Sequence, residues 1–231
     1  MATRINWSNH PENKITTSRW ILSFLSLKVR EDQFRIFWRN LKPRKNSKVL
    51  DVGVTPNQDL IDSNFFEKRY PYSTNLTAVS VEDCGILKEF YPHVTFKKIE
   101  PFKKLPFPDH SFDIGVSWAT IEHVGDRFQQ AFFVSELCRV ARQVFITTPN
   151  KYFFYEPHSG LIFVHWLPNK YFGAICRVLG KRFWGDIRNL NPLGKNDFLK
   201  MLPEGVVGKV VYHKMFDLFN SHMMLFIKNK K

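Results

Sequence analysis

Apolar side chains recur at helical spacing in two long segments of the chain. In residues 17–41, Trp20, Phe24 and Leu27 fall on one face. Residues 127–142 repeat apolar side chains at about every third position. Because a helix brings positions three and four apart onto one face, we expect both segments to be helices. The first would either pack on the domain or lie on a membrane surface.

Short apolar runs alternate with helix-like pieces from residue 48 onward. The runs expected to be strands cover 48–54, 76–82, 94–100, 111–118 and 143–150. The pieces expected to be helical cover 58–70 (or an irregular turn), 83–91, 127–142, 169–179 and 196–202, the last with Asn196 as a candidate cap. This alternation favours parallel strands joined by crossover helices.

Two more strand-like runs, 206–215 and 221–229, close the chain. They predict an α/β fold, a doubly wound Rossmann-like sheet of seven mostly parallel strands with flanking helices and a reversed strand near the C-terminus. We expect residues 1–47 to be a basic helical cap and 48–150 the core. Residues 151–231 would be an aromatic lid or acceptor region plus the final strands of the same domain.

Composition narrows the class of protein. Of 231 residues, 44% are hydrophobic and 16% aromatic, so a packed core is expected. The three cysteines form no C-x-x-C pair, which argues against a disulfide framework or a zinc site. The polar start lacks a signal-peptide core, and no apolar run reaches membrane-spanning length. We therefore expect a cytoplasmic protein, with peripheral membrane contact left open.

Positive charge gathers at both ends of the chain. The net charge is +13. Residues 1–48 carry 11 Lys/Arg against 3 Asp/Glu, and residues 151–231 carry 13 against 5, whereas residues 49–150 carry 10 against 13. The basic flanks suit an anionic partner such as a phosphorylated metabolite, nucleic acid or acidic lipid surface. A solubilising surface explains them equally well.

Acidic residues stand at the carboxyl end of each of the first three predicted strands. They are Asp51, then Glu82 and Asp83, then Glu100. Ligands of open α/β sheets bind beyond the carboxyl ends of the strands. Acids at matching positions would converge on one crevice and suit a ligand with hydroxyl and amino groups, such as a nucleoside carrying an amino acid.

Four blocks together resemble a known enzyme family. They are "VLDVG", "LTAVSVED", "LPFPDHSFDIGVSWATIEHV" and "ELCRVARQVFITTPN", within about residues 48–150. The combination resembles class I S-adenosylmethionine-dependent methyltransferases, closest to the type 11 branch that includes ubiquinone and menaquinone biosynthesis enzymes. A nicotinamide dehydrogenase would need G-x-G-x-x-G after the first strand, and "GVTPNQ" lacks it.

The resemblance implies a cofactor, S-adenosyl-L-methionine, and roles for individual residues. Gly53 would let the backbone approach the methionine part, and Asp51 would hold its amino group. Glu82 or Asp83 would take the ribose hydroxyls, and Glu100 would lie near adenine. The stretch from Ser117 to His123 would run along the cofactor and the acceptor.

The glycine loop departs from the family pattern D-x-G-x-G-x-G. Thr55 replaces the second glycine and Asn57 the third, while Ser80 stands where the usual acid of the second strand would align. Thr55 would still border the cofactor. The departures leave open a non-catalytic relative that kept the fold and lost the chemistry.

Histidines near the expected acceptor side are the candidates for proton transfer. His123 in "IEHV", with Glu122 beside it, comes first, and His158 in "EPHSG" second. His165 is a further candidate. Each could instead be a hydrogen-bonded structural residue. The set shows no recognised metal-ligand spacing in the sequence, so we expect no metal.

The sequence leaves three functions open. The first is O- or C-methylation of a small-molecule, glycan or lipid-linked acceptor in a pocket lined by residues 152–190. The second is an RNA methyltransferase that uses the basic flanks. The third is the non-catalytic binding protein. "TTPN" stands where an N/D-P-P-Y motif would be, which argues against exocyclic amino groups as the target. The oligomeric state is left open.

Overall fold

The computed structural model describes residues 10, 17–216 and 218–229. It divides into two compact units, residues 1–103 and 104–231. Their strands form a seven-stranded sheet in the order β3-β2-β1-β4-β5-β9-β8. The strands are mostly parallel, and β9 runs antiparallel to its neighbour β5. The predicted Rossmann-like architecture with a reversed C-terminal strand is therefore confirmed.

The first unit is a three-stranded parallel portion of the sheet with one long helix and several short ones. Its elements are α1 (Thr17–Leu41), β1 (Val49–Val52), α2 (Phe65–Arg69), η2 (Ser73–Asn75), β2 (Leu76–Ser80), α3 (Leu87–Phe90) and β3 (Thr95–Lys98). All four residues of β1 are buried, whereas β3 is mostly exposed. Pairing aligns Asp51 with Ala78, and Ser80 with Lys98.

The long helix α1 has the bounds that the sequence pattern predicts, and its second half packs on α2. Phe37 meets Phe66 with ring centroids 5.5 Å apart, and Phe34 also touches the Phe66 ring. In the first half, the side chains of Trp20 and Phe24 are exposed. Aromatic burial therefore fixes the C-terminal part of α1 on this unit.

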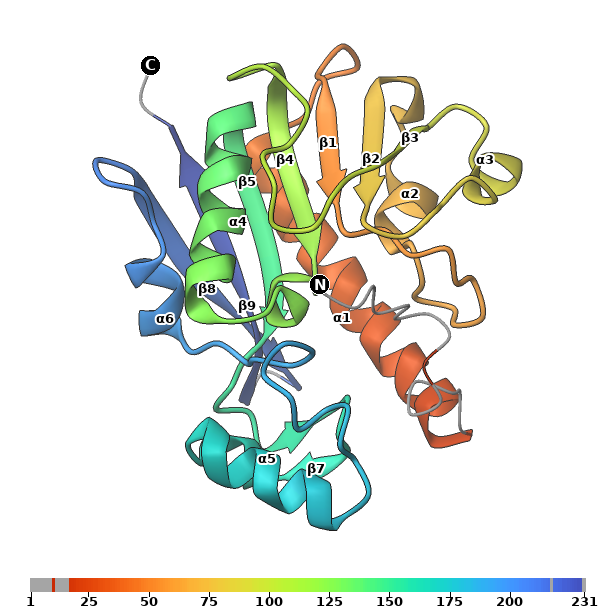
Figure 1. Cartoon of the computed structure of the whole chain (residues 1–231). Helices are drawn as coiled ribbons and strands as arrows, with labels where there is room; N and C mark the ends of the chain where they lie inside the picture. Colours follow the sequence, from red (N-terminus) through yellow and green to blue (C-terminus); the bar gives the residue numbers. More distant parts are fainter. Residues whose placement is uncertain (1–9, 11–16, 217, 230–231) are drawn as a thin grey trace. The chain divides into compact units, whose positions relative to one another are not determined.

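The second unit combines the other four strands with three helices and a small hairpin (Figure 1). Its elements are β4 (Phe112–Trp118), η3 (Ile121–His123), α4 (Arg127–Val140), β5 (Ala141–Pro149), β6 (Tyr155–Glu156), β7 (Leu161–Ile162), η4 (Val164–Trp166), α5 (Asn169–Val178), α6 (Lys195–Lys200), β8 (Val207–Met215) and β9 (Phe219–Lys228). α4 lies along β5, and α5 lies beside the β6–β7 hairpin (Figure 1).

Arg139 on α4 explains one of the blocks that carried the family resemblance. Its guanidinium donates to the backbone carbonyls of Leu105 and Phe107, both at 2.9 Å, and pairs with Asp109 and Glu136. Glu136 in turn accepts from the Leu105 backbone N–H at 2.8 Å. The "LPFPD" segment is therefore held against α4 by one branched cation, in a geometry that lysine cannot reproduce.

The 58–70 segment contains both predicted alternatives, because a loop held by side-chain hydrogen bonds precedes the short helix α2. Two other local predictions need correction. The N-cap of α6 is Gly194, whose backbone N–H donates to Asp197, and Asn196 lies inside the helix. The β6–β7 hairpin falls in the aromatic run, where no strand was predicted.

Among the described residues, no helix has the length and apolar character needed to cross a bilayer. The cysteines Cys84, Cys138 and Cys176 are all buried.

Candidate functional site

Asp51 lies in the buried strand β1 and shares its surroundings with a second carboxyl group. Its side chain is hydrogen-bonded to Glu67 of α2, and both residues are at most 5% exposed. Burial raises the pKa of Asp51 well above its usual value, and the Glu67 charge raises it further. Burial also raises the pKa of Glu67. Two adjacent buried carboxyls cannot both ionise easily, so the pair retains a proton.

The loop after β1 is built from the residues that replace the family glycines. Gly53 has φ of 118° and donates its N–H to Val79, a conformation that favours glycine. The Thr55 hydroxyl accepts from the Asn57 N–H at 3.3 Å. Asn64 binds both backbone polar groups of Thr55, at 3.0 and 2.7 Å. Side-chain hydrogen bonds thus define this turn at the positions where the family pattern has glycine.

The acids after β2 and β3 lie two residues or more beyond the strand ends. β2 ends at Ser80 and β3 at Lys98, so the predicted strand ends at Glu82 and Glu100 were wrong by two residues. Burial raises the pKa of the Cys84 thiol to about 11, and the charges of Glu82 and Asp83 add to this rise. Both carboxylates therefore lie near Cys84.

The other carboxylates of this edge make local contacts. Asp83 accepts from the Gly85 N–H at 2.9 Å. Glu100 is exposed and pairs with Lys103 at 2.6 Å. The cofactor roles of Asp83 and Glu100 remain predictions. A ligand could reach either side chain without breaking a buried contact.

In the second unit, Ser117 is fully buried in β4, and the chain after it bends sharply. Ala119 adopts φ of 49°, a left-handed conformation that is uncommon for a residue with a Cβ, and η3 follows directly. The turn carries Glu122 and His123. Ser117 itself stays a predicted contact; it lies next to the C-terminal end of β4, and its side chain is inside the core.

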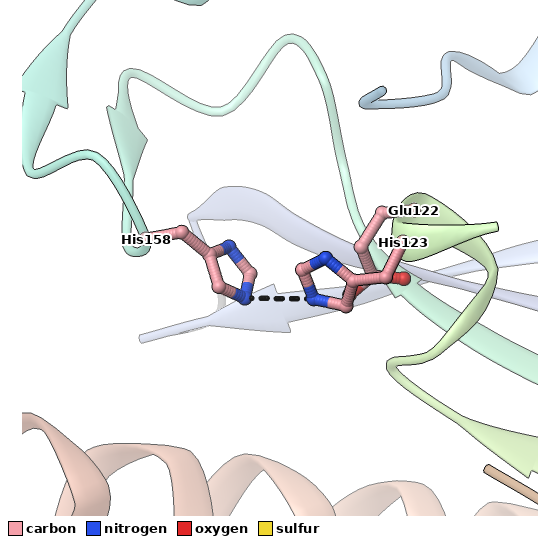
Figure 2. A group of neighbouring side chains, drawn as sticks. All are labelled: Glu122, His123 and His158. Atoms are coloured by element: carbon pink, nitrogen blue, oxygen red, sulfur yellow. Dashed lines mark hydrogen bonds between the residues drawn. The ribbon is translucent and has the colours of Figure 1, made fainter. Parts of the chain in front are cut away.

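Glu122, His123 and His158 lie together, although 35 positions separate the two histidines. Figure 2 shows both rings pointing toward each other, His123 from η3 and His158 from the turn after β6. Their Nε2 atoms are 3.2 Å apart, and possible ligand atoms of the three residues lie within 4.8 Å of one another. Glu122 is buried and accepts from the Thr148 hydroxyl at 2.9 Å.

Glu156 orients His158 through two hydrogen bonds. Its carboxylate accepts from His158 Nδ1 at 2.7 Å and from the His158 backbone N–H at 3.0 Å. Burial alone would raise the pKa of Glu156, but attraction to His158 and hydrogen bonds from His158 and Ser159 lower it to about 2. Glu156 is therefore an ionised carboxylate at neutral pH.

The loop before α6 orients His123. The Asn189 carbonyl oxygen lies 2.8 Å from His123 Nδ1, and the Trp184 ring stands 5.2 Å from His158. Asn191 fixes this loop, because its carbonyl accepts from Gln130 of α4 at 3.0 Å and its backbone N–H donates to Glu122. Both imidazoles are therefore oriented at their Nδ1 atoms, and their Nε2 atoms face each other.

His165 has a structural role. It is buried, and its Nε2 lies 2.8 Å from the Phe153 carbonyl oxygen. Burial lowers its pKa, so it is neutral at neutral pH and donates there. Together with Glu122 and His158 it lines a cavity of about 10 Å³, which holds roughly one water molecule. That volume is far below a small-molecule pocket, so the predicted closed pocket over 152–190 is not formed at this cluster.

Sequence reasoning missed Glu67, Glu156 and Asn189. Glu156 carried a signal, because it stands two residues before His158 in "EPHSG". Glu67 in "NFFEKR" looks like a solvent-facing helical residue, and Asn189 acts through its backbone carbonyl. Neither leaves a pattern in the residue letters.

Comparisons with known proteins agree with this fold. Residues 69–144 match the family described as a methyltransferase domain, a range that begins after the altered glycine loop. No curated protein matches the chain.

Solved structures of methyltransferases superimpose over most of the chain. The N-methyltransferase NodS from Bradyrhizobium japonicum WM9, in complex with S-adenosyl-L-homocysteine, has a TM-score of 0.54 at 14% identity, covering 87% of each chain. The methyltransferase domain of bacterial CtHen1 gives 0.55 at 14%, covering 89% of this chain and 100% of that one. An S-adenosylmethionine-dependent methyltransferase from Mesorhizobium loti gives 0.54 at 10%, covering 83% and 97%.

These likenesses show the fold, and residues 69–144 resemble a methyltransferase domain. Together they support the predicted class I methyltransferase that uses S-adenosyl-L-methionine.

Proposed function

We propose that this protein transfers the methyl group of S-adenosylmethionine to a hydroxyl group of a small-molecule, glycan or lipid-linked acceptor. The observation that carries the proposal is the cluster of Glu122, His123 and His158. A hydroxyl must lose its proton as it attacks the sulfonium methyl group, and imidazole with an oriented ring suits that task near neutral pH. An amine acceptor would need no such cluster once it is neutral.

The chain's own residues divide the work between donor and acceptor. Carboxyl groups within β1 and after β2 and β3 would hold the donor, with Asp51 toward its ammonium group and Glu82 or Asp83 toward the ribose. The acceptor oxygen would bind at the histidine pair, and its proton would be removed there. Because the sulfonium is already an excellent leaving group, most of the catalysis is positioning.

An exposed apolar surface on the second unit supports a lipid-linked acceptor at an anionic membrane. We call it the aromatic surface, and it consists of Phe154, Ile162, Phe163, Trp166, Leu167 and Tyr171, all at least 38% exposed. The rings of Phe163 and Trp166 are 4.8 Å apart. Lys170 is exposed beside Tyr171, and residues 151–231 carry the excess of positive charge noted above. Apolar side chains with basic neighbours suit the interface of an anionic bilayer.

Calorimetric titration with S-adenosylmethionine, and with its demethylated product, tests the donor half. We expect micromolar binding that is lost in Asp51→Ala and kept in Asp59→Ala, an exposed acid of the following loop. Absence of binding at millimolar ligand would favour the non-catalytic alternative.

Transfer of a radiolabelled methyl group into separated cell fractions tests the acceptor half. Label in lipid or glycan fractions, reduced by about 10²–10⁴-fold in His158→Ala, is the expected outcome. Donor binding should be unchanged in that variant. Label confined to RNA would overturn the acceptor class while leaving the methyltransferase assignment intact.

RNA is the second candidate because the first unit has a basic hollow. It has a volume of about 340 Å³ and is lined by Phe34, Trp38, Arg35, Arg39 and Arg69. Arg35 and Arg69 are already paired with Asp32 and Glu31. A phosphate would compete with those acids for the guanidinium groups, which weakens this candidate relative to the first.

A further inference from the structure

The histidine pair is held in an arrangement that two neutral imidazoles cannot satisfy alone. His123 Nδ1 faces the Asn189 carbonyl, and His158 Nδ1 faces the Glu156 carboxylate. Carbonyl and carboxylate oxygens only accept hydrogen bonds, so each Nδ1 carries a hydrogen. In a neutral imidazole the other nitrogen, Nε2, then carries a lone pair and no hydrogen. Two lone pairs consequently face each other across 3.2 Å.

A positive species between the two Nε2 atoms resolves the conflict. It is either a shared proton or a metal ion. Two nitrogen ligands of one tetrahedral ion, each about 2.0–2.1 Å from it, lie roughly 3.3 Å apart. The Nε2 atoms already stand at nearly that separation. Glu122 adds a carboxylate close to both, with possible ligand atoms of all three residues within 4.8 Å.

The surroundings of the cluster are those of a metal site. Metal-binding histidines typically donate their second N–H to a carboxylate or a backbone carbonyl, which fixes the ring and strengthens the ligand. Here Glu156 serves His158, and the Asn189 carbonyl serves His123. Thr148 similarly donates to Glu122. Each of the three candidate ligands therefore has an outer hydrogen-bond partner.

We propose that Glu122, His123 and His158 bind one divalent first-row transition metal ion, such as Zn²⁺. Two imidazole nitrogens and one carboxylate suit Zn²⁺, Fe²⁺ or Co²⁺, whereas Mg²⁺ and Ca²⁺ prefer oxygen ligands throughout. The sequence shows no metal motif because two ligands are adjacent and the third is 35 positions away. Folding of the β6 turn creates the site.

Binding of the ion stands apart from methyl transfer, but its use in the reaction rests on the proposed function. An ion at this position would acidify a coordinated acceptor hydroxyl. His123 and His158 would then hold the ion instead of accepting the proton, and the acidified hydroxyl would release its proton to solvent water as the methyl group moves from sulfur to oxygen.

Cobalt titration of the full chain tests the site directly. The protein is prepared without a histidine tag, stripped with a chelator, and titrated with Co²⁺ while the visible absorption is recorded, then with Zn²⁺ in competition. We expect one ion per chain, displaced by Zn²⁺ and unaffected by excess Mg²⁺. His123→Ala and His158→Ala should each weaken binding at least 100-fold. Glu156→Gln, which alters only the outer partner, should weaken it about 10–100-fold.

His93→Ala is the matched control, because His93 is exposed and outside the cluster. It should bind Co²⁺ as the unaltered chain does. Circular dichroism verifies that each variant is folded, and His158→Gln replaces His158→Ala if the latter is not. The proposal is overturned if neither metal saturates the protein, or if both histidine variants bind with unaltered affinity. Since neither donor nor acceptor is present, those results leave methyl transfer untouched.

Discussion

At the scale of single residues, Asn64 illustrates how one side chain replaces missing glycines. It accepts from and donates to the Thr55 backbone, and its own φ of 45° lies in the left-handed region. Asparagine tolerates that region better than most residues with a Cβ. The departure from the family glycine pattern is thus compensated in the structure, nine positions further along the chain.

Asn64→Ala should lower the free energy of unfolding by about 2–4 kcal/mol. The substitution removes two hydrogen bonds and places alanine in a left-handed conformation. Asn64→Gly removes the same hydrogen bonds without the conformational cost and should be about 1 kcal/mol less destabilising than Asn64→Ala. Urea unfolding of both variants measures the difference. Equal losses would show that φ at this position carries no cost.

The Asp51–Glu67 pair makes stability depend on pH. A carboxyl whose pKa is raised by folding stabilises the folded state fully below its unfolded value, about 4, and this contribution is lost as pH rises through the folded value. The pKa values of both groups are raised. The amide of Asp51→Asn cannot ionise, so this variant does not lose stability as the pH rises.

We accordingly expect Asp51→Asn to exceed the unaltered protein in unfolding free energy at pH 7–8, by on the order of 1–2 kcal/mol. The gap should close as pH falls toward about 4. Denaturant titrations at several pH values measure it, with the exposed Asp59→Asn as a control that opens no gap. A gap that widens on acidification would contradict the shared proton.

At the scale of elements, the chain's periodic segments were predictable and its junctions were not. Residues 17–41 are helical as expected because the apolar repeat is long and ends before Pro43. The first strand stops at Val52, since Gly53 turns away with positive φ. Glu122 and His123 were predicted from a sequence motif. Their contact with His158 depends on the β6–β7 hairpin, which the hydrophobic pattern of the sequence does not predict.

Arg139 joins α4 to the segment before β4, and its replacement tests that junction. Arg139→Lys retains the charge but cannot reach Leu105, Phe107, Asp109 and Glu136 together. We expect a loss of about 2–3 kcal/mol in unfolding free energy. Arg142→Lys, at an exposed neighbouring position, should stay within about 0.5 kcal/mol. Similar values for both variants would mean that the hydrogen bonds of Arg139 contribute nothing net.

At the scale of the whole molecule, the net charge and the exposed apolar area bear on which anionic partner the protein binds. A net charge of +13 favours any polyanion, so charge alone does not discriminate between RNA and lipid. The aliphatic members of the aromatic surface, Ile162 and Leu167, do discriminate, because they gain affinity by insertion into a bilayer, whereas RNA bases stack on aromatic rings. Substitution within that surface therefore separates the two partners.

Co-sedimentation with vesicles gives the decisive measurement. The full chain should bind vesicles of phosphatidylcholine with phosphatidylserine more tightly than phosphatidylcholine alone, and raised salt should weaken this binding. Ile162→Ser combined with Leu167→Ser removes two aliphatic side chains that are 55% and 40% exposed and should reduce vesicle affinity at least about tenfold. Phe128→Ser, a ring 82% exposed on α4, is the matched control and should leave it unchanged. Two results would contradict the membrane-linked acceptor: normal vesicle binding by the double variant, or tighter binding to RNA that neither substitution changes. In either case charge alone, without apolar insertion, would account for binding to the anionic partner.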